Sequence, residues 1–232
     1  MRPPVRFAPL GDRALVLRLG ERADEPTFDR VRSCAARLAG AHRAILDVVP
    51  AYTTVTVHYD PSRVESTSEP PHRALAAALE PLIHDDAHPP LIARTVEIPV
   101  CYEGDLAPDL DEVARHTGLD AQEVIALHSG ATYVVRMIGF LPGFPYLAGL
   151  DPRLATPRRA EPRTRVAAGS VGIGGEQTGI YPVTSPGGWR LIGRTPLALF
   201  DARREPGALL AVGDTLRFHA ISRTDYDRMS AR

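Results

Sequence analysis

The sequence contains no lysine, and all 27 of its basic residues are arginine. Without lysine the chain has no amine nucleophile, no Schiff-base former and no cation for a Walker-type phosphate loop. Cysteine is almost as scarce. Cys34 and Cys101 are the only two, and their spacing fits neither a metal site nor a redox motif. We therefore expect two reduced, structural thiols.

Long apolar runs are also missing. No stretch approaches the roughly 20 apolar residues that cross a bilayer, so we expect no transmembrane helix. The start, Met1-Arg2-Pro3-Pro4, lacks the charged-then-apolar order of a secretory signal, which favours a cytoplasmic protein. The 27 basic residues are balanced by 28 acidic ones, so the net charge of −1 gives no overall attraction to nucleic acid or to an anionic membrane.

What is present is a globular composition rich in backbone breakers. The chain has 232 residues, 44% hydrophobic and 24% charged, which excludes a disordered chain, a collagen-like repeat and a coiled coil. It also has 22 prolines and 19 glycines, and residues 141–213 are especially rich in both. Such a segment favours short strands joined by tight loops over long helices.

The first half alternates between strand and helix patterns. The apolar spacing predicts a β-α-β-β-α order, which is most of a split βαβ or ferredoxin-like unit. Residues 94–100 either supply its last strand or open the next domain, and the polar, proline-bearing stretch 84–90 is the expected linker. The predicted elements are strands at 13–19, 44–49 and 53–59 and helices at 25–38 and 70–83.

A helical hairpin is predicted at about residues 108–129, with helices at 110–117 and 121–129. Asp120 is a good N-cap, and Glu123 completes a variant of the capping box. The pair superficially resembles a DNA-binding helix-turn-helix, but its second helix carries no arginine for phosphates or guanine edges. We therefore expect a structural hairpin and no nucleic-acid partner.

The second half reads as many short strands separated by glycine and proline turns, which indicates a barrel or a sandwich. The pattern predicts strands within 133–140, 163–182, 189–196, 197–201 and 214–221.

Three glycine-rich clusters lie in this half, at residues 139–149, 169–182 and 184–196. Glycine at such density marks special backbone angles or the close approach of a ligand, and barrel corners are the simpler explanation. The G-x-G at Gly172 does not extend to G-x-G-x-x-G, because Gln177 stands at the last position. Neither Ser170 nor Ser185 lies in a G-x-S-x-G elbow, and the histidines have no metal-ligand spacing, so we predict no metal site.

The clusters carry a resemblance to a known family. Residues 132–157 (TYVVRMIGFLPGFPYLAGLDPRLATP), 162–182 and 185–196, with IPVCY at 98–102 and GDRAL at 11–15, closely resemble one family of proteins. It is the family of the B subunit of 5-oxoprolinase, allophanate hydrolase subunit 1 and the Kip inhibitor (carboxyltransferase domain, subdomains C and D). The resemblance implies an α+β fold, in which a small ferredoxin-like α/β domain at 1–90 precedes a cyclophilin-like β-barrel domain at 91–232.

The resemblance also implies an activity that the chain does not perform alone. It points to a subunit of an ATP-dependent 5-oxoprolinase, which opens 5-oxo-L-proline to L-glutamate while ATP is hydrolysed to ADP and phosphate. The implied partners are a homologous subunit 2, of the C type, and an unrelated, lactam-using subunit of the A type. The complex uses ATP, and whether ATP touches this chain stays open, as does self-association.

Two other functions remain open. One is a protein inhibitor of a sensor histidine kinase, which needs only a protein-binding surface. The other is a urea- or allophanate-processing component, for which biotin would have to arrive on another chain, because this one has no lysine.

We expect the candidate site to bind rather than to attack, since no nucleophile or general base can be named. Backbone N–H groups of the glycine-rich wall would stabilise developing charge together with Gln177, Thr178 and Arg194, and aromatic rings would exclude water. Replacing Gln177 or Arg194 by alanine should then abolish activity and leave the fold intact, and Glu176 at the edge should tune ligand preference. The expected site residues are His128, Arg136, Phe140, Pro142, Gly143, Phe144, Tyr146, Gly175, Gln177, Thr178, Gly179, Tyr181, Ser185, Gly187, Gly188, Trp189 and Arg194.

Overall fold

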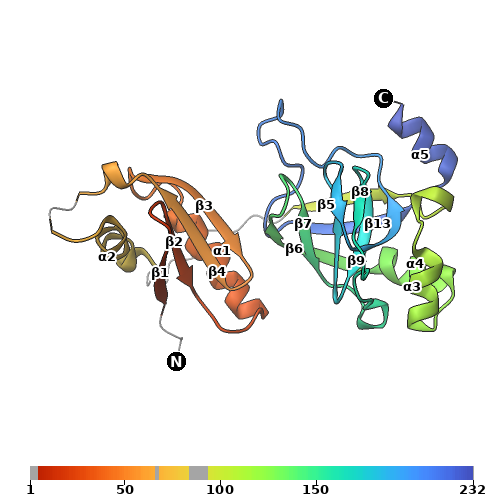
Figure 1. Ribbon diagram of the computed structural model, residues 1–232, viewed down its shortest axis with the longest axis horizontal. Coiled ribbons are helices and arrows are strands. Elements are labelled where there is room, and N and C mark those ends of the chain that lie inside the picture. The colour runs from red at the N-terminus through yellow and green to blue at the C-terminus, as the bar shows by residue number, and fades with distance from the viewer. Residues whose placement is uncertain (1–4, 66–67, 84–93, 232) are drawn as a thin grey trace. The chain divides into compact units, whose positions relative to one another are not determined.

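The computed structural model describes residues 5–65, 68–83 and 94–231 of the chain (Figure 1). The chain divides into two compact units, Met1–Ile92 and Ala93–Arg232, and each has its own buried apolar core. Both units combine helices with largely antiparallel strands, so the fold is α+β. The predicted linker at 84–90 lies outside the described residues.

The first unit is an antiparallel sheet with the strand order β1-β2-β4-β3. Since β2 and β3 both run antiparallel to β4, they are parallel to each other, and the helix α1 connects them as a split βαβ. The bounds are β1 Arg6–Leu10, β2 Ala14–Arg18, α1 Glu25–Leu38, β3 Ile45–Ala51, β4 Thr54–Tyr59 and α2 Pro71–Ile83.

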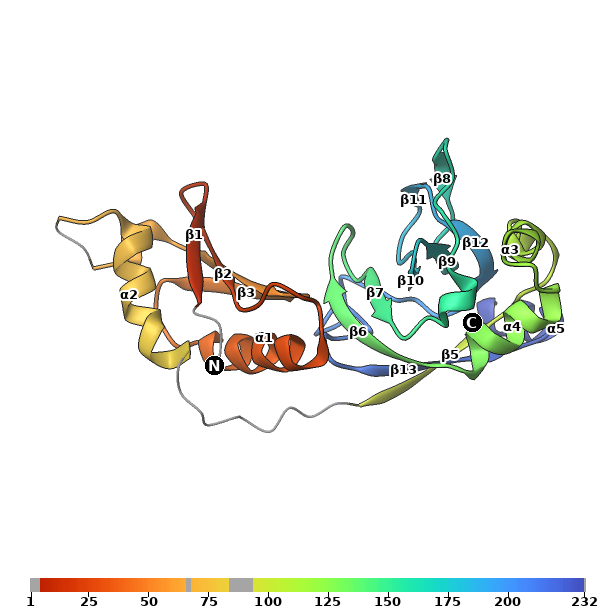
Figure 2. The ribbon, with the colours of Figure 1, turned by 90° about the horizontal axis from the view of Figure 1, so that it is seen from below.

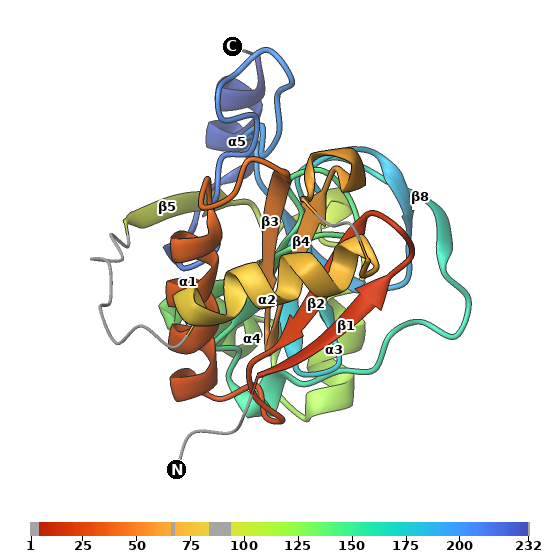
Figure 3. The same cartoon turned by 90° about the vertical axis from the view of Figure 1, so that its left-hand side faces the viewer.

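The helices α1 and α2 pack on one face of this sheet and can be followed in Figure 3. Alternate residues of the strands, such as Leu15, Leu17 and Val57, are fully buried against Val31 and Leu75 of the helices. The predicted helix at 25–38 is confirmed. It is capped by the Asp24 side chain, which accepts from the backbone N–H of Thr27 at 3.0 Å.

The fourth strand of this sheet is β1, which precedes the other three in the sequence and pairs with β2. The sequence left open whether 94–100 would fill this place. Instead, β5 (Thr95–Val100) pairs in parallel with β13 (Thr215–Ala220) of the second unit. The sequence pattern did not predict β1, because Pro9 interrupts the alternation and most of the strand's side chains are exposed.

The second unit contains a continuous series of paired strands. They follow the order β5-β13-β6-β7-β10-β9-β12. Cys101, which follows β5, and Arg194, at the end of β12, then exchange two backbone hydrogen bonds of 2.9 Å, so the pairing returns to its start. The remaining bounds are β6 Thr132–Ile138, β7 Pro145–Ala148, β9 Ser170–Gly174, β10 Gln177–Ile180 and β12 Arg190–Arg194.

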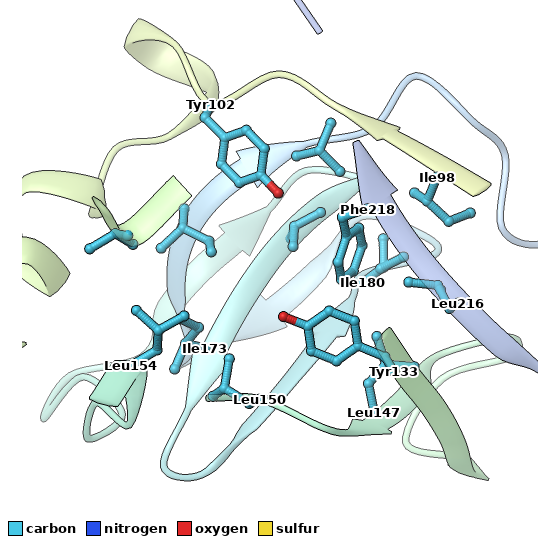
Figure 4. Close-up of a cluster of buried hydrophobic side chains, with 14 of the residues drawn as sticks. Ile98, Tyr102, Tyr133, Leu147, Leu150, Leu154, Ile173, Ile180, Leu216 and Phe218 are labelled. Carbon is cyan, nitrogen blue, oxygen red and sulfur yellow. The ribbon is translucent and has the colours of Figure 1, made fainter. Parts of the chain in front are cut away.

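Large apolar side chains fill the inside of this ring of strands. Figure 4 shows Ile98, Tyr133, Leu147 and Phe218 directed into the shared interior, and all four are nearly inaccessible to solvent. The core therefore occupies the space that the ring encloses.

Three α-helices accompany the strands in the described part of the second unit. The predicted hairpin is confirmed as α3 (Leu110–Thr117) and α4 (Ala121–Gly130), and Asp120 with Glu123 forms the capping box. The helix α5 (Arg223–Ser230) was missed, although Ser222 followed by Asp225 is a cap signal. None of the helices in the described residues is long and apolar enough to span a membrane.

The strand predicted at 197–201 is wrong. Only Phe200 forms a β-bridge there, with Ala208, and the segment otherwise follows an irregular path after Pro196. The apolar pattern has another cause, because Leu199 is buried in the core of the second unit and Leu197 packs against that core.

Candidate functional site

An aromatic cluster lies on the second unit, outside the ring's interior. Phe144 is at its centre, with ring centroids 5.6 Å from Phe140, 5.2 Å from Tyr181, 5.5 Å from Trp189 and 4.9 Å from Tyr146. Three of these contacts are edge-to-face, the geometry that the charge distribution of aromatic rings favours. The cluster therefore joins segments that lie far apart in the sequence.

The glycines beneath the cluster let its rings lie directly on the backbone. A Cβ on Gly174 would lie 2.7 Å from the indole of Trp189, and one on Gly179 would lie 3.1 Å from the ring of Phe144. A Cβ on Gly187 would collide with the hydroxyl of Tyr181. The dense glycines therefore allow the close approach of aromatic side chains, in addition to any special backbone angles that the sequence predicted.

These side chains surround a pocket of about 280 Å³. One of its borders is a two-stranded ribbon, β8 (Arg163–Val166) with β11 (Ser185–Gly187), whose strands lie side by side in Figure 2. The pocket is mostly apolar, with two phenol hydroxyls and one guanidinium. Its lining residues are Phe140, Phe144, Tyr146, Arg158, Pro162, Tyr181, Pro186, Gly187, Gly188 and Trp189.

Arg158 is the cation of this pocket. Its guanidinium carbon lies 5.6 Å from the centre of the Trp189 ring, a cation–π contact. Burial raises the pKa of Tyr146 and of Tyr181, and the charge of Arg158 opposes both shifts, which indicates that the guanidinium lies near both phenols. Within the described ranges, no carboxylate forms an ion pair with Arg158.

The neighbouring arginines point elsewhere. Arg163 donates two hydrogen bonds, of 2.9 and 2.7 Å, to the carboxylate of Asp109, and Arg159 lies 3.5 Å from the same group. Asp109 is 3% exposed and also accepts from the backbone N–H of Leu191 at 2.7 Å. This bidentate pair ties β8 to the start of α3 and fixes the base of the ribbon.

His128 lies in the core of the second unit and not in the pocket. The hydroxyl of Thr178 donates to the Gly172 carbonyl at 2.9 Å, so its oxygen accepts from Nε2–H of His128 at 3.0 Å. Nδ1 is then the acceptor for the hydroxyl of Tyr102 at 2.8 Å. Burial lowers the pKa of His128 to about 3, so the ring is neutral and holds one tautomer.

Arg194 also makes contacts within the fold and does not line the pocket. Its Nε donates to the Ala168 carbonyl at 2.8 Å, beside the bridge to Cys101. Gly143 lies in the turn between β6 and β7 with φ at +80°, and a Cβ there would lie 3.1 Å from the Leu199 carbonyl. Gly175 lies in the turn between β9 and β10 and forms a bridge with Thr156.

The structure thus gathers part of the predicted site. Phe140, Phe144, Tyr146, Tyr181, Gly187, Gly188 and Trp189 line one pocket. His128, Arg136, Pro142, Gly143, Gly175, Gln177, Thr178, Gly179, Ser185 and Arg194 are not among its lining residues, although Gly179 supports Phe144 from below.

Three further lining residues, Arg158, Pro162 and Pro186, were not among those predicted from the sequence. Arg158 stands just after one of the family-like segments and before the next, in a chain with 27 arginines, so no local signal distinguished it. Within the described ranges, no group of three histidine, cysteine, aspartate or glutamate side chains is placed to hold a metal ion.

The fold and pocket define an α+β protein of two units, the second of which is a ring of strands carrying an aromatic pocket. The chain belongs to the family described as carboxyltransferase domain, subdomain C and D, whose model matches residues 5–210. The resemblance inferred from the glycine-rich motifs is thereby confirmed.

The relatives cover the chain to different extents. It is 43% identical over 226 residues to the B subunit of 5-oxoprolinase from Bacillus subtilis (strain 168), a match that covers 94% of this chain and 93% of that protein. It is 58% identical over 126 residues to the B subunit of 5-oxoprolinase from Escherichia coli O157:H7, a match that covers 54% of this chain and 58% of that protein. The crystal structure of TTHA0988 superposes with a TM-score of 0.77 at 41% identity, and this chain covers 40% of that one.

Proposed function

We propose that the chain is one subunit of an ATP-dependent 5-oxoprolinase complex that converts 5-oxo-L-proline, ATP and water into L-glutamate, ADP and phosphate. The observation that carries the proposal is the 43% identity to the B subunit of a 5-oxoprolinase along nearly the whole of both chains. In this proposal the chain is inactive alone and works in the cytoplasm.

The chemistry of the pocket supports a subunit that binds and leaves the bond-breaking groups to others. Its lining offers rings, two phenols and a guanidinium, and no carboxylate or imidazole that would act as a general base. A ring amide is a poor electrophile, and phosphorylation of its oxygen by ATP would make it reactive. In the proposed complex the remaining groups come from a homologous subunit of the C type and a lactam-using subunit of the A type.

The pocket does not fit ATP itself. A volume of about 280 Å³ is small for a whole nucleotide, and a single arginine would face several phosphate charges. We therefore assign ATP to the complex and not to this pocket.

The strand pairings support a finer proposal on the fold. The split βαβ of the first unit fits a ferredoxin-like domain whose outer strand comes from the N-terminal side. The ring of strands joined at Cys101 and Arg194 fits a cyclophilin-like barrel. We propose that these two units are the two domains of the chain.

Reconstitution tests the function directly. This chain is mixed with its two proposed partners, 5-oxo-L-proline and ATP, and glutamate is measured with each protein omitted in turn. Glutamate formed only by the complete mixture supports the proposal. A stable complex that yields no glutamate, or glutamate formed without this chain, would overturn it.

A further inference from the structure

The aromatic pocket contains a positive charge with no negative partner among the described residues. Arg158 lies over the ring of Trp189, while Arg159 and Arg163 are held by Asp109. A guanidinium stacked on an aromatic face keeps its N–H groups in a fixed plane, which suits a carboxylate that accepts two parallel hydrogen bonds. The pocket therefore has the electrostatic character of a site for a small anion.

We propose that this pocket binds 5-oxo-L-proline, with Arg158 pairing with the carboxylate and the aromatic rings enclosing the lactam ring. The inference rests on the proposed function for the identity of the ligand. It goes beyond that function by placing a substrate-binding site in this polypeptide and by assigning its specificity to Arg158.

The size of the pocket agrees with such a ligand. Its volume of about 280 Å³ lies near the lower end of the roughly 300–1,000 Å³ that is typical of small-molecule pockets. A five-membered lactam with one carboxylate is a ligand of this scale. Flat apolar walls with a few placed polar groups are typical of pockets for small molecules.

The remaining polar groups match the other end of the ligand. Burial raises the pKa of Tyr146 and of Tyr181, so both phenols keep their protons at neutral pH. A protonated phenol donates a hydrogen bond, which is what the lactam carbonyl accepts. The guanidinium and the phenols thus address the two polar ends of one small molecule.

Phe140 lies at the edge of the pocket in an unusual conformation. Its φ of +69° is rare for a bulky residue, and its side chain is 63% exposed while its ring packs edge-to-face on Phe144. An exposed ring held in a strained backbone is common at ligand sites. We assign it the role of covering the bound lactam ring.

Trp189 is the only tryptophan in the chain, so its fluorescence reports on this pocket alone. The purified protein is titrated with 5-oxo-L-proline, with 2-pyrrolidinone, which lacks the carboxylate, and with L-proline, which lacks the ring carbonyl. Isothermal titration calorimetry gives each affinity independently. We expect saturable binding of 5-oxo-L-proline that is about tenfold or more tighter than that of either analogue, because each analogue leaves one polar group unpaired.

The variants Arg158→Ala and Arg158→Lys test the assignment, and Arg165→Ala serves as the matched control because Arg165 is exposed and does not line the pocket. We expect about tenfold or greater loss for Arg158→Ala, a smaller loss for Arg158→Lys, and none for the control. Equal affinity of Arg158→Ala and the native protein, or equal affinity for 2-pyrrolidinone, would overturn the assignment. Absence of any saturable signal would overturn the site.

The same variants in the complete complex separate the two proposals. Arg158→Ala should raise KM for 5-oxo-L-proline about tenfold or more. Native protein that binds the ligand in a complex that forms no glutamate would reject the function and keep the site. Normal turnover with an unchanged KM in Arg158→Ala would keep the function and reject the site, and would favour a partner's carboxylate as the group that meets Arg158.

Discussion

Single glycines allow the aromatic rings of the pocket to lie directly on the backbone. The ring of Trp189 rests on the backbone at Gly174, and the ring of Phe144 rests on Gly179. Any larger residue at either place would move a ring that lines the pocket. The glycine-rich segment is therefore a packing surface, which local sequence rules interpret as turns.

Gly174→Ala should destabilise the second unit by about 1–3 kcal/mol, because its Cβ would lie 2.7 Å from the indole of Trp189. Urea unfolding followed by tryptophan fluorescence measures the change, and a red shift of the folded-state emission should accompany it. Gly130→Ala, where no heavy atom lies within 4 Å of the added Cβ, should stay within about 1 kcal/mol of the native protein. Equal stabilities for the two variants would contradict this packing argument.

His128 should make stability depend on pH. Burial lowers its pKa in the folded protein to about 3 from an ordinary 6.5, so between these values the unfolded chain binds one more proton than the folded chain. Stability therefore falls as the pH drops through this window, by up to about 1.4 kcal/mol per pH unit.

The measurement is the free energy of unfolding between about pH 6.5 and about pH 4.5. It is compared among the native protein, His128→Gln and a His116→Gln control on the hairpin helix α3. The slope with pH should flatten in His128→Gln even though its overall stability is lower. It should be unchanged in His116→Gln. A slope that survives in His128→Gln would show that other groups cause the acid sensitivity.

At the scale of elements, the ribbon of β8 and β11 borders the pocket and depends on one buried carboxylate. Asp109, at the start of α3, accepts two hydrogen bonds from the guanidinium of Arg163, the first residue of β8. The two parallel hydrogen bonds fix the relative orientation of both groups, and they join segments 54 residues apart in the sequence. The ion pair therefore connects the ribbon to a distant segment of the chain, in addition to the pairing of its own short strands.

Arg163→Ala should cost about 3 kcal/mol, because it leaves the carboxylate of Asp109 buried without its main partner. It should also loosen the pocket and weaken any ligand bound there. Arg165→Ala, on the same strand and exposed, should change stability by no more than about 0.5 kcal/mol. Chemical denaturation of the two variants side by side provides the measurement, and comparable losses would count against the ion pair.

At the scale of the whole molecule, the two units have separate cores, and the tryptophan lies in the second. Residues 93–232 expressed alone should therefore fold cooperatively and keep the emission maximum of Trp189. Thermal unfolding of this fragment, followed by fluorescence, should show a single cooperative transition. A fragment with fully exposed tryptophan emission would show that the second unit needs the first.

The sequence determined the family and most of the local elements, with β1, α5 and the segment 197–201 as exceptions. Apolar spacing and capping residues place the helices at 25–38, 110–117 and 121–129, since these signals act within a few residues. The long glycine-rich motifs were enough to identify the family. The aromatic residues of the pocket were also among those predicted.

Only the tertiary structure decided which of those residues share a site. Strand pairing brings Phe140 and Trp189 to one pocket, while the alternation of side chains across β10 turns Thr178 inward to His128. It also gave 94–100 to the second unit and left Arg158 without an acidic partner among the described residues. These outcomes depend on register and on contacts between distant segments, which no local pattern in the chain encodes.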